Sequence, residues 1–227
     1  MKRYIWFILF YIVIHIPVSS QRNSDYGVFG GVAHYMGDIN PTNYFYSPSP
    51  ALGIIYRYNF HPRHSVRGNL YWGGLKGNDL DFNNAFQQAR GKSFSGSVFE
   101  LGAQFEFNFL PYSTTGKWWD YTPYFAGGIA VSFINTATFS YIPVIPLSVG
   151  FKINVYKNIG LEVEYGFRKT FYDNFDDLID NIDPDHYSWA HNNDWYMFTG
   201  VTFTWKMFHN LSSCPAYADT ENKRKKY

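Results

Sequence analysis

The sequence predicts an all-β protein: an eight-stranded antiparallel transmembrane β-barrel of the outer-membrane type, with both termini periplasmic. Strict alternation is the first observation. From Phe99 to Phe109, apolar residues alternate with polar ones, and successive side chains of a strand point to opposite faces. Two further observations support the barrel. The alternation recurs in segments long enough for a tilted strand to cross a bilayer, and the connections alternate between short and long.

Three of the first four predicted strands have one apolar and one polar face. In the first strand, Gly27, Gly30 and Gly31 leave the apolar and polar faces unassigned. In the others, large apolar residues fill one face and polar residues the other, as expected of a strand between lipid and a polar interior. The four strands are residues 25–36, 51–60, 65–73 and 94–109, and the apolar faces of the last three run from Leu52 to Phe60, Val66 to Trp72 and Phe99 to Phe109.

The last four strands repeat this pattern with clear alternation. The final strand contains Phe198-Thr199-Gly200-Val201-Thr202-Phe203, which looks like the assembly signal of outer-membrane barrels. The four strands are residues 121–135, 146–156, 159–171 and 195–208, and their apolar faces run from Phe125 to Phe133, Leu147 to Val155, Leu161 to Phe167 and Trp195 to Met207.

The lengths of the connections predict the orientation of the barrel. Outer-membrane barrels keep short turns on the periplasmic side and long loops outside. An even strand count then returns both termini to the periplasm. The predicted short turns are 61–64, 110–120 and 157–158, and the predicted loops are 37–50, 74–93, 136–145 and 172–194.

Composition narrows the class of protein. Aromatic residues make up 22% of the 227 residues and charged residues only 16%. A mean hydropathy of −0.28 excludes a helical membrane protein with many spans but not a barrel, in which lipid-facing and inward residues average out. The net charge of +1 gives no basis for binding nucleic acid. We expect outer-membrane lipid as a partner, and no small-molecule substrate.

The N-terminus predicts export. Lys2 and Arg3 precede an apolar stretch, residues 4–16, which small residues follow. This is the pattern of a secretory signal peptide, and the stretch is short for a retained helical anchor. We therefore expect a signal peptide at 1–20, cleaved near Ser20 or Gln21, an outer-membrane barrel at 21–208 and a periplasmic C-terminal tail at 209–227. The predicted location is the cell outer membrane.

The polar faces of the strands predict a charge network inside the barrel. An eight-stranded barrel is only wide enough for its own side chains to fill, and buried charges must be paired. The nearly balanced signs therefore favour structural salt bridges over a transport path. The predicted network contains Arg57, Arg67, Lys152, Arg168 and Lys206 as cations and Glu100, Glu106, Glu162 and Glu164 as anions.

The most polar loop is a weak candidate for a metal site. Its acidic residues could supply oxygen ligands to a cation, but their spacing does not match an EF-hand loop and the required glycine is missing. A solvated loop that contacts a partner is the favoured interpretation. The weak candidates are Asp173, Asp176, Asp177 and Asp180.

We predict no enzyme activity and no cofactor. A lipid hydrolase or acyltransferase barrel would need a nucleophile and a base near the membrane edge. The histidines, among them His34, His61, His64 and His209, are scattered, and no Gly-x-Ser-x-Gly elbow occurs. We therefore expect no catalytic residues.

The single cysteine, Cys214, lies in the predicted tail. A lone cysteine in an exported protein cannot form an internal bridge, which leaves an intermolecular disulfide or a free thiol.

Several short segments together resemble the PorG-like family, the small outer-membrane barrel of the type IX secretion system. The segments are Gly37-Asp38-Ile39-Asn40, Glu106-Phe107-Asn108-Phe109-Leu110, Thr122-Pro123-Tyr124, Gly160-Leu161-Glu162, Arg168-Lys169-Thr170-Phe171 and Asn192-Asn193-Asp194-Trp195-Tyr196.

The resemblance implies a non-catalytic component that docks the periplasmic ring, made of a PorK-like lipoprotein and a PorN-like subunit, to the outer membrane. Such a system exports proteins and, in some bacteria, supports gliding motility. In that setting an intermolecular disulfide from Cys214 to a ring subunit becomes the preferred hypothesis. The alternative is an autonomous barrel that acts as an adhesin or stabilises the envelope through its extracellular loops.

Overall fold

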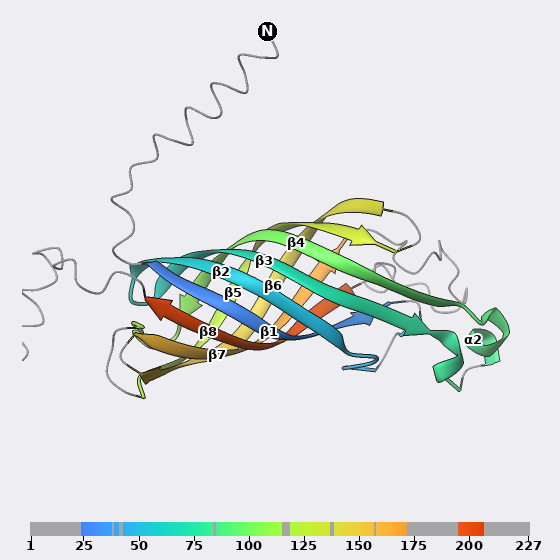
Figure 1. Cartoon of the computed structure of the whole chain (residues 1–227), viewed down its shortest axis with the longest axis horizontal. Helices are drawn as coiled ribbons and strands as arrows, with labels where there is room; N and C mark the ends of the chain where they lie inside the picture. Colours follow the sequence, from blue (N-terminus) through green and yellow to red (C-terminus); the bar gives the residue numbers. More distant parts are fainter. Residues whose placement is uncertain are drawn as a thin grey trace, which may run out of the picture.

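The computed structural model describes residues 24–37, 39–40, 43–83, 85–114, 119–136, 139–156, 158–171 and 195–206. These residues form a closed antiparallel barrel of eight strands (Figure 1), which confirms the predicted fold class. No helix among them is long and apolar enough to cross a membrane. The strands are β1 (Ser24–Met36), β2 (Ser49–His61), β3 (His64–Asn78), β4 (Ser93–Asn108), β5 (Tyr121–Asn135), β6 (Phe139–Tyr156), β7 (Ile159–Thr170) and β8 (Trp195–Lys206).

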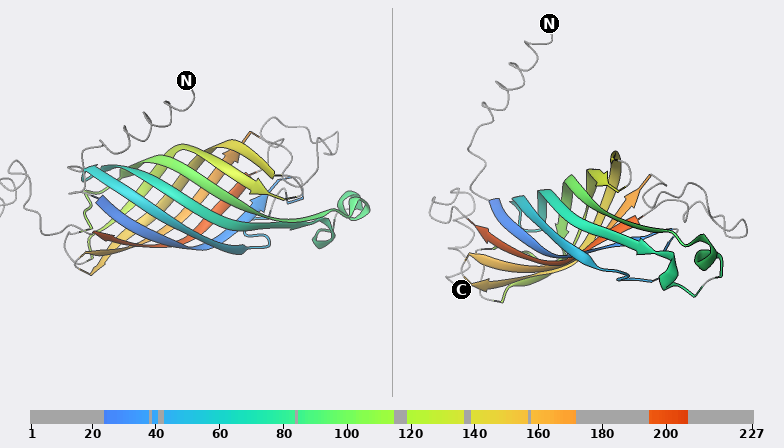
Figure 2. Two further views of the ribbon diagram at one scale, coloured as in Figure 1. Left: turned by 45° about the horizontal axis from the view of Figure 1, so that its top comes forward. Right: turned by 45° about the vertical axis from the view of Figure 1, so that its right-hand side comes forward.

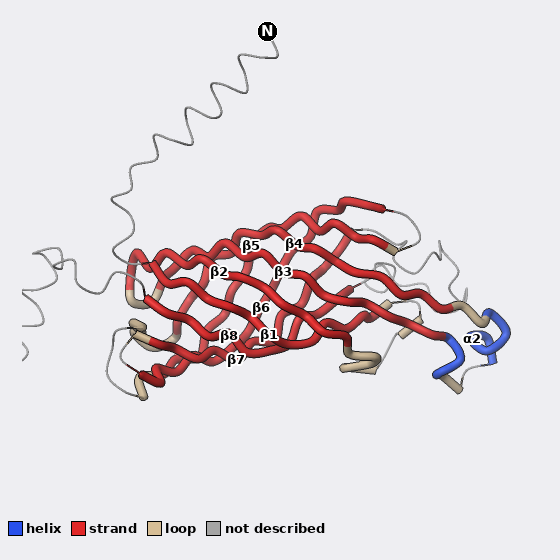
Figure 3. The backbone as a smooth tube through the Cα atoms, in the orientation of Figure 1, coloured by secondary structure: helices blue, strands red, loops and turns tan. Residues whose placement is uncertain are grey.

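Each strand pairs with its neighbour in sequence, and β8 pairs with β1 to close the barrel. The strands run obliquely around the barrel (Figure 3). Its two ends differ. The turn end holds the β2–β3, β4–β5 and β6–β7 turns, together with the start of β1 and the end of β8. The opposite end is called the arm end because a hairpin projects from it.

Burial along the strands shows that the apolar faces point outward. On β4, Leu101 is 57% exposed, whereas the flanking Glu100 and the nearby Glu106 are completely buried. A soluble sheet would have the opposite arrangement, with its apolar face inward. The outside is therefore an apolar surface suited to lipid, and the predicted assignment of faces is confirmed.

Two strands are longer than the sequence pattern predicted, by five residues or more at one end. β3 continues from residue 73 to Asn78, and β6 begins at Phe139 rather than at 146. The extension of β3 still has a buried face, with Leu75, and an exposed face, with Lys76. Because Gly74 and Gly77 have no side chain and the outward Lys76 is charged, the apolar–polar alternation is not visible in the sequence although pairing with β4 continues. In β6, proline hides the strand from sequence analysis. Pro146 lacks an amide donor, and the β5–β6 pairing lapses beside it and resumes at Val144.

The predicted loop 74–93 is largely an ordered arm. The β3–β4 ribbon extends past the barrel and carries a short 3₁₀ helix, η2 (Asp79–Asp81), and a single helix, α2 (Ala85–Arg90). Figure 2 shows the arm projecting from the barrel. Buried Asp79 accepts two hydrogen bonds from the Arg90 guanidinium, both of 2.7 Å, and a third from the Lys92 amide at 3.0 Å. This carboxylate therefore holds the tip together.

The arm is also attached to the β1–β2 loop. The Gln87 side-chain amide donates to the carbonyl of Ile39 at 2.8 Å. The Tyr46 hydroxyl donates to the Asp81 carboxylate at 2.6 Å and accepts from the Asn78 amide at 3.0 Å. Partial burial and the adjacent Asp81 raise the pKa of Tyr46 to about 12, so this donor persists at physiological pH. Two independent contacts thus fix the direction of the arm.

Inward-facing glycines make room for large interior side chains. A Cβ atom on Gly53 would lie 2.0 Å from the ring of Tyr71, the residue opposite it on β3. A Cβ on Gly166 would lie 1.8 Å from the Arg168 guanidinium, and one on Gly150 would lie 2.6 Å from the Tyr124 ring. At these positions the narrow barrel therefore accepts a large side chain because a nearby residue, on the same or the next strand, has none.

We predict that Gly53→Ala lowers the free energy of unfolding by about 1–3 kcal/mol, the range of overpacking in a closely packed core. Gly30→Ala is the matched control on β1, because a Cβ at Gly30 meets nothing within 4 Å. Its effect should stay within about 0.5 kcal/mol. Urea unfolding in lipid vesicles, followed by tryptophan fluorescence, measures both. Equal losses in the two variants would show that the Tyr71 ring is not responsible.

Candidate functional site: a sealed interior and two structured ends

The part of the interior near the turn end is organised around Arg57 on β2. Its guanidinium makes two parallel hydrogen bonds of 2.6 Å to the Glu162 carboxylate on β7. Its Nε atom lies 3.1 Å from Glu106 on β4. All three side chains are buried. A paired, fork-like contact of this kind is the strongest geometry available to arginine, and it ties together strands on different sides of the barrel.

Arg67 on β3 repeats the arrangement with Glu164 on β7. Its two terminal nitrogens lie 2.5 and 2.9 Å from the carboxylate oxygens. The Arg67 Nε atom donates to Gln104 at 2.6 Å, and the Tyr124 hydroxyl donates to Glu164 at 2.5 Å. The Glu164 carboxylate is thus satisfied by donors from two other strands.

Lys152 on β6 completes this part of the network. Its ammonium contacts the Glu106 carboxylate and donates to the Asn108 side chain at 3.0 Å. It also lies 4.4 Å from the centre of the Tyr124 ring. The Glu106 carboxylate therefore accepts hydrogen bonds from cations on two strands, because Arg57 donates to the same carboxylate.

A second cluster surrounds Arg168 on β7. Its Nε atom lies 3.2 Å from Glu100, which also accepts from the Tyr196 hydroxyl at 2.6 Å. The guanidinium carbon lies 5.0 Å from the centre of the Phe198 ring and 5.4 Å from that of Tyr71. Arg168 thus joins the charge network to the apolar part of the interior.

The structure brings together eight of the nine predicted network residues: Arg57, Arg67, Glu100, Glu106, Lys152, Glu162, Glu164 and Arg168. The ninth, Lys206, is half-buried at the end of β8 and makes no ion pair with any residue that the structure describes. It lies opposite Asp25 in the β1–β8 register.

Sequence analysis missed Asp25. This carboxylate is buried, accepts a hydrogen bond from Asn59 at 2.6 Å and lies 3.9 Å from Arg57. The glycines of the first strand hid its two faces. The other strands do not reveal which residues of the first strand point inward, because that depends on how the first strand pairs with its neighbours. The one usable signal is that Asp25 is an isolated acid in a strand that is otherwise nearly uncharged.

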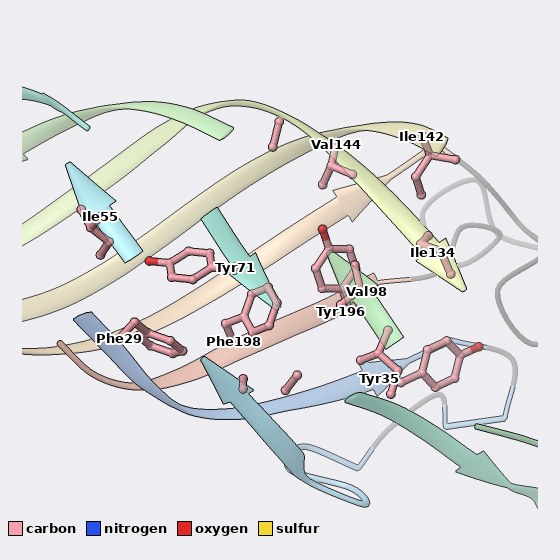
Figure 4. Close-up of a cluster of buried hydrophobic side chains, with 14 of the residues drawn as sticks. Phe29, Tyr35, Ile55, Tyr71, Val98, Ile134, Ile142, Val144, Tyr196 and Phe198 are labelled. Carbon is pink, nitrogen blue, oxygen red and sulfur yellow. The ribbon is translucent and has the colours of Figure 1, made fainter. Parts of the chain in front are cut away.

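Toward the arm end the interior is apolar. Figure 4 shows this cluster, which includes Phe29, Tyr71 and Phe198, pointing into the barrel. The rings of Phe29 and Tyr71 lie 5.0 Å apart, and those of Tyr71 and Phe198 lie 5.2 Å apart. Side chains therefore fill this section as they fill a protein core. Among the described residues, the interior is thus a packed, charge-paired core.

The β4–β5 turn covers the turn end. Tyr112 in this turn is buried, donates its amide to Pro62 at 3.0 Å and its hydroxyl to Asn154 at 3.3 Å. Burial raises the pKa of the Tyr112 hydroxyl above its ordinary value. Asn154 in turn donates to the carbonyl of Ser113 at 2.8 Å. Hydrogen bonds to the β2–β3 turn and to β6 thus hold this segment against the turn end of the barrel.

Several predicted features lie outside the described residues. The acidic loop with Asp173, Asp176, Asp177 and Asp180, the predicted signal peptide and the tail with Cys214 all do so. Within the described parts of the chain, no group of three His, Cys, Asp or Glu side chains could hold a metal ion.

Comparison with known proteins shows the family. Residues 2–216 match the family described as "Domain of unknown function (DUF6089)", and the chain belongs to it. No curated protein matches the sequence.

Solved structures show the same fold. Neisserial surface protein A is similar with a TM-score of 0.51 and 9% identity, over 82% of this chain and 97% of that one. The outer membrane protein OprG of Pseudomonas aeruginosa is similar with a TM-score of 0.43 and 9% identity, over 83% of this chain and 99% of that one. Ail, the attachment invasion locus protein of Yersinia pestis, is similar with a TM-score of 0.42 and 10% identity, over 80% of this chain and 97% of that one. The first similarity, to an outer-membrane barrel, shows the fold, and no residue role is transferred from it.

We predict that Glu164→Gln lowers the free energy of unfolding by about 3–5 kcal/mol, because the buried Arg67 guanidinium then loses its paired carboxylate and keeps only Glu106, 3.7 Å away and already shared with Arg57 and Lys152. The double variant Arg67→Met/Glu164→Leu should lose less than this single variant, since no charge is then stranded. Lys206→Gln is the control and should change stability by about 0.5 kcal/mol or less. Urea unfolding in vesicles measures all three. A double variant less stable than the single one would contradict the argument.

Proposed function

We propose that this protein is a non-catalytic outer-membrane component of the type IX secretion machinery, which docks a periplasmic ring of PorK-like and PorN-like subunits to the membrane. The sealed interior is the observation that carries the proposal. Paired charges and aromatic rings fill the described interior, as expected of a barrel only wide enough for its own side chains. Function therefore belongs to the surfaces at the two ends of the barrel.

The resemblance to the PorG-like family supports the choice of machine. Its segments include Glu106, Glu162 and Arg168 of the charge network, and Tyr124, which donates to Glu164. The resemblance therefore concerns the internal framework of the barrel and not only its surface. A barrel built in this way, in a chain whose N-terminus predicts export, fits a structural role in the outer membrane.

The turn end is the docking surface that we propose. Its β4–β5 turn presents Trp119, whose side chain is 67% exposed and whose backbone has the unusual φ of 67°. A hydrogen bond of 3.1 Å from the Trp119 amide to the Asn154 carbonyl holds this conformation. Strained backbone and exposed tryptophan are both common at interaction sites. The chain also leaves β8 at this end and continues toward Cys214.

The first test is a pull-down of the tagged full-length chain from membranes. We expect stoichiometric recovery of ring proteins, reduced at least tenfold in Trp119→Ala because a truncated interface tryptophan typically costs about 2 kcal/mol or more. Leu80→Ala, at the tip of the arm on the opposite end, is the control and should recover as much as the wild type. Recovery of the barrel alone from the wild type would reject the ring-docking function.

The second test concerns Cys214. We expect non-reducing electrophoresis of whole cells to show a band at the summed mass of the barrel and a ring subunit, because the periplasm favours disulfides. The band should disappear on reduction and in Cys214→Ser. A wild-type band at the mass of the monomer alone would reject the disulfide. The pull-down would then still test docking through non-covalent contacts.

A second candidate function is an autonomous adhesin or envelope-stabilising barrel, and the arm favours it. The arm is ordered, is attached to the β1–β2 loop and exposes Leu80 and Phe86 at its tip, by 64% and 44%. Exposed apolar side chains on a fixed projection suit contact with another macromolecule. The pull-down distinguishes the two functions, since an autonomous barrel is recovered without ring proteins.

A further inference from the structure

The outer face of β7 and β8 at the arm end carries an isolated positive charge. Lys169 points outward from β7, in line with Tyr165 and Phe167. Among the described outward-facing residues of β1, β7 and β8, it is the only charged one. A lysine on a surface that lipid covers belongs near the headgroups, where its ammonium can leave the hydrocarbon.

Among the residues that the structure describes, Lys169 has no carboxylate as a counter-charge. Its neighbour Arg168 points inward, is buried and is paired with Glu100, whereas no described carboxylate lies within ion-pair distance of Lys169. The Lys169 ammonium instead lies 4.3 Å from the centre of the Trp195 ring, on the strand beside it. A tryptophan that supports a cation is typical of the boundary between hydrocarbon and headgroups. Within the described part of the chain, the charge on this ammonium is thus met by an aromatic ring and by no carboxylate.

The surface beside Lys169 is aromatic. Tyr165 donates its hydroxyl to the Met197 sulfur at 3.2 Å. The Phe45 ring, from the β1–β2 loop, lies 5.7 Å from the Tyr165 ring. Phe45 has a φ of 60°, which is costly for a bulky side chain. The loop is thus held against the outer face of the barrel in spite of that cost.

A second polar group without a partner lies in the same region. His34 on β1 shares a row of the sheet with Met197 and Phe167, one row from Lys169 and Trp195. Its side chain is 1% exposed, and neither ring nitrogen has a hydrogen-bond partner. The Phe45 ring lies 4.9 Å away from it. A buried imidazole with no partner is costly, and here it lies on the lipid-facing side of the wall.

We propose that this surface, made of His34, Phe45, Tyr165, Lys169, Trp195 and Met197, binds the phosphorylated headgroup of a lipid. The Lys169 ammonium pairs with a phosphate, and the aromatic side chains below it contact the start of the acyl chains. His34 is the second polar group within reach of the sugar or glycerol part of the headgroup when the Phe45 ring shifts. The site goes beyond the proposed docking function and does not depend on it.

The test uses the purified full-length chain in detergent and native mass spectrometry. The probes are diphosphoryl lipid A and the same lipid with both phosphates removed. We expect the wild type to retain the phosphorylated lipid at least tenfold more tightly than the dephosphorylated one. Lys169→Gln should lose this preference, and Lys169→Arg, which keeps the charge, should preserve it. Lys76→Gln, an exposed lysine on the arm, is the control and should behave as the wild type.

Only folded protein is compared, selected by its heat-dependent migration on gels, and Lys169→Met serves as a second neutral variant. Equal retention of the two lipids by the wild type would overturn the proposal. So would a Lys169→Gln variant that keeps the preference. Millimolar inorganic phosphate should not release the lipid. If it does, the site recognises a free anion and the lipid assignment is wrong.

Discussion

The pairing of charges inside a closed, narrow barrel is the constraint on which the rest of the structure depends. A charge that cannot reach water must find a partner with good geometry. Arg57, Arg67 and Arg168 each find a carboxylate on another strand, across the interior or along its wall. These contacts join strands that are not neighbours in the sheet. The network therefore holds the cross-section of the barrel, in addition to the hydrogen bonds between neighbouring strands.

The same constraint determines where glycine occurs. A guanidinium or a tyrosine ring in this interior needs the space of a missing side chain, as Arg168 does beside Gly166 and Tyr71 beside Gly53. With charges toward the turn end and aromatic rings toward the arm end, no continuous polar path remains along the described interior. A barrel of this kind acts through its ends and its lipid-facing surface, and the proposed ring-docking and lipid sites lie there.

Eight of the network residues could be predicted from the sequence because alternation assigns a strand residue to one face or the other, and only two faces exist. Asp25 could not, because Gly27, Gly30 and Gly31 leave β1 without a recognisable apolar face. Lys206 was placed on the correct face, but it lies at the end of its strand, where a charge is half-buried and pairing is not required. Alternation thus predicts whether a side chain points into or out of the barrel. It does not predict how far along the barrel axis, and therefore how deeply buried, that side chain lies.

The sequence by itself determined the number of strands, the side that meets lipid in every strand except β1, and the need for an internal charge network, since each follows from local periodicity. Only the tertiary structure decided which charges meet, because Arg57 and Glu162 are brought together by register and barrel closure. It also revealed the arm and the position of Lys169 over the Trp195 ring. Both depend on contacts between segments far apart in the chain, about which a local pattern carries no information.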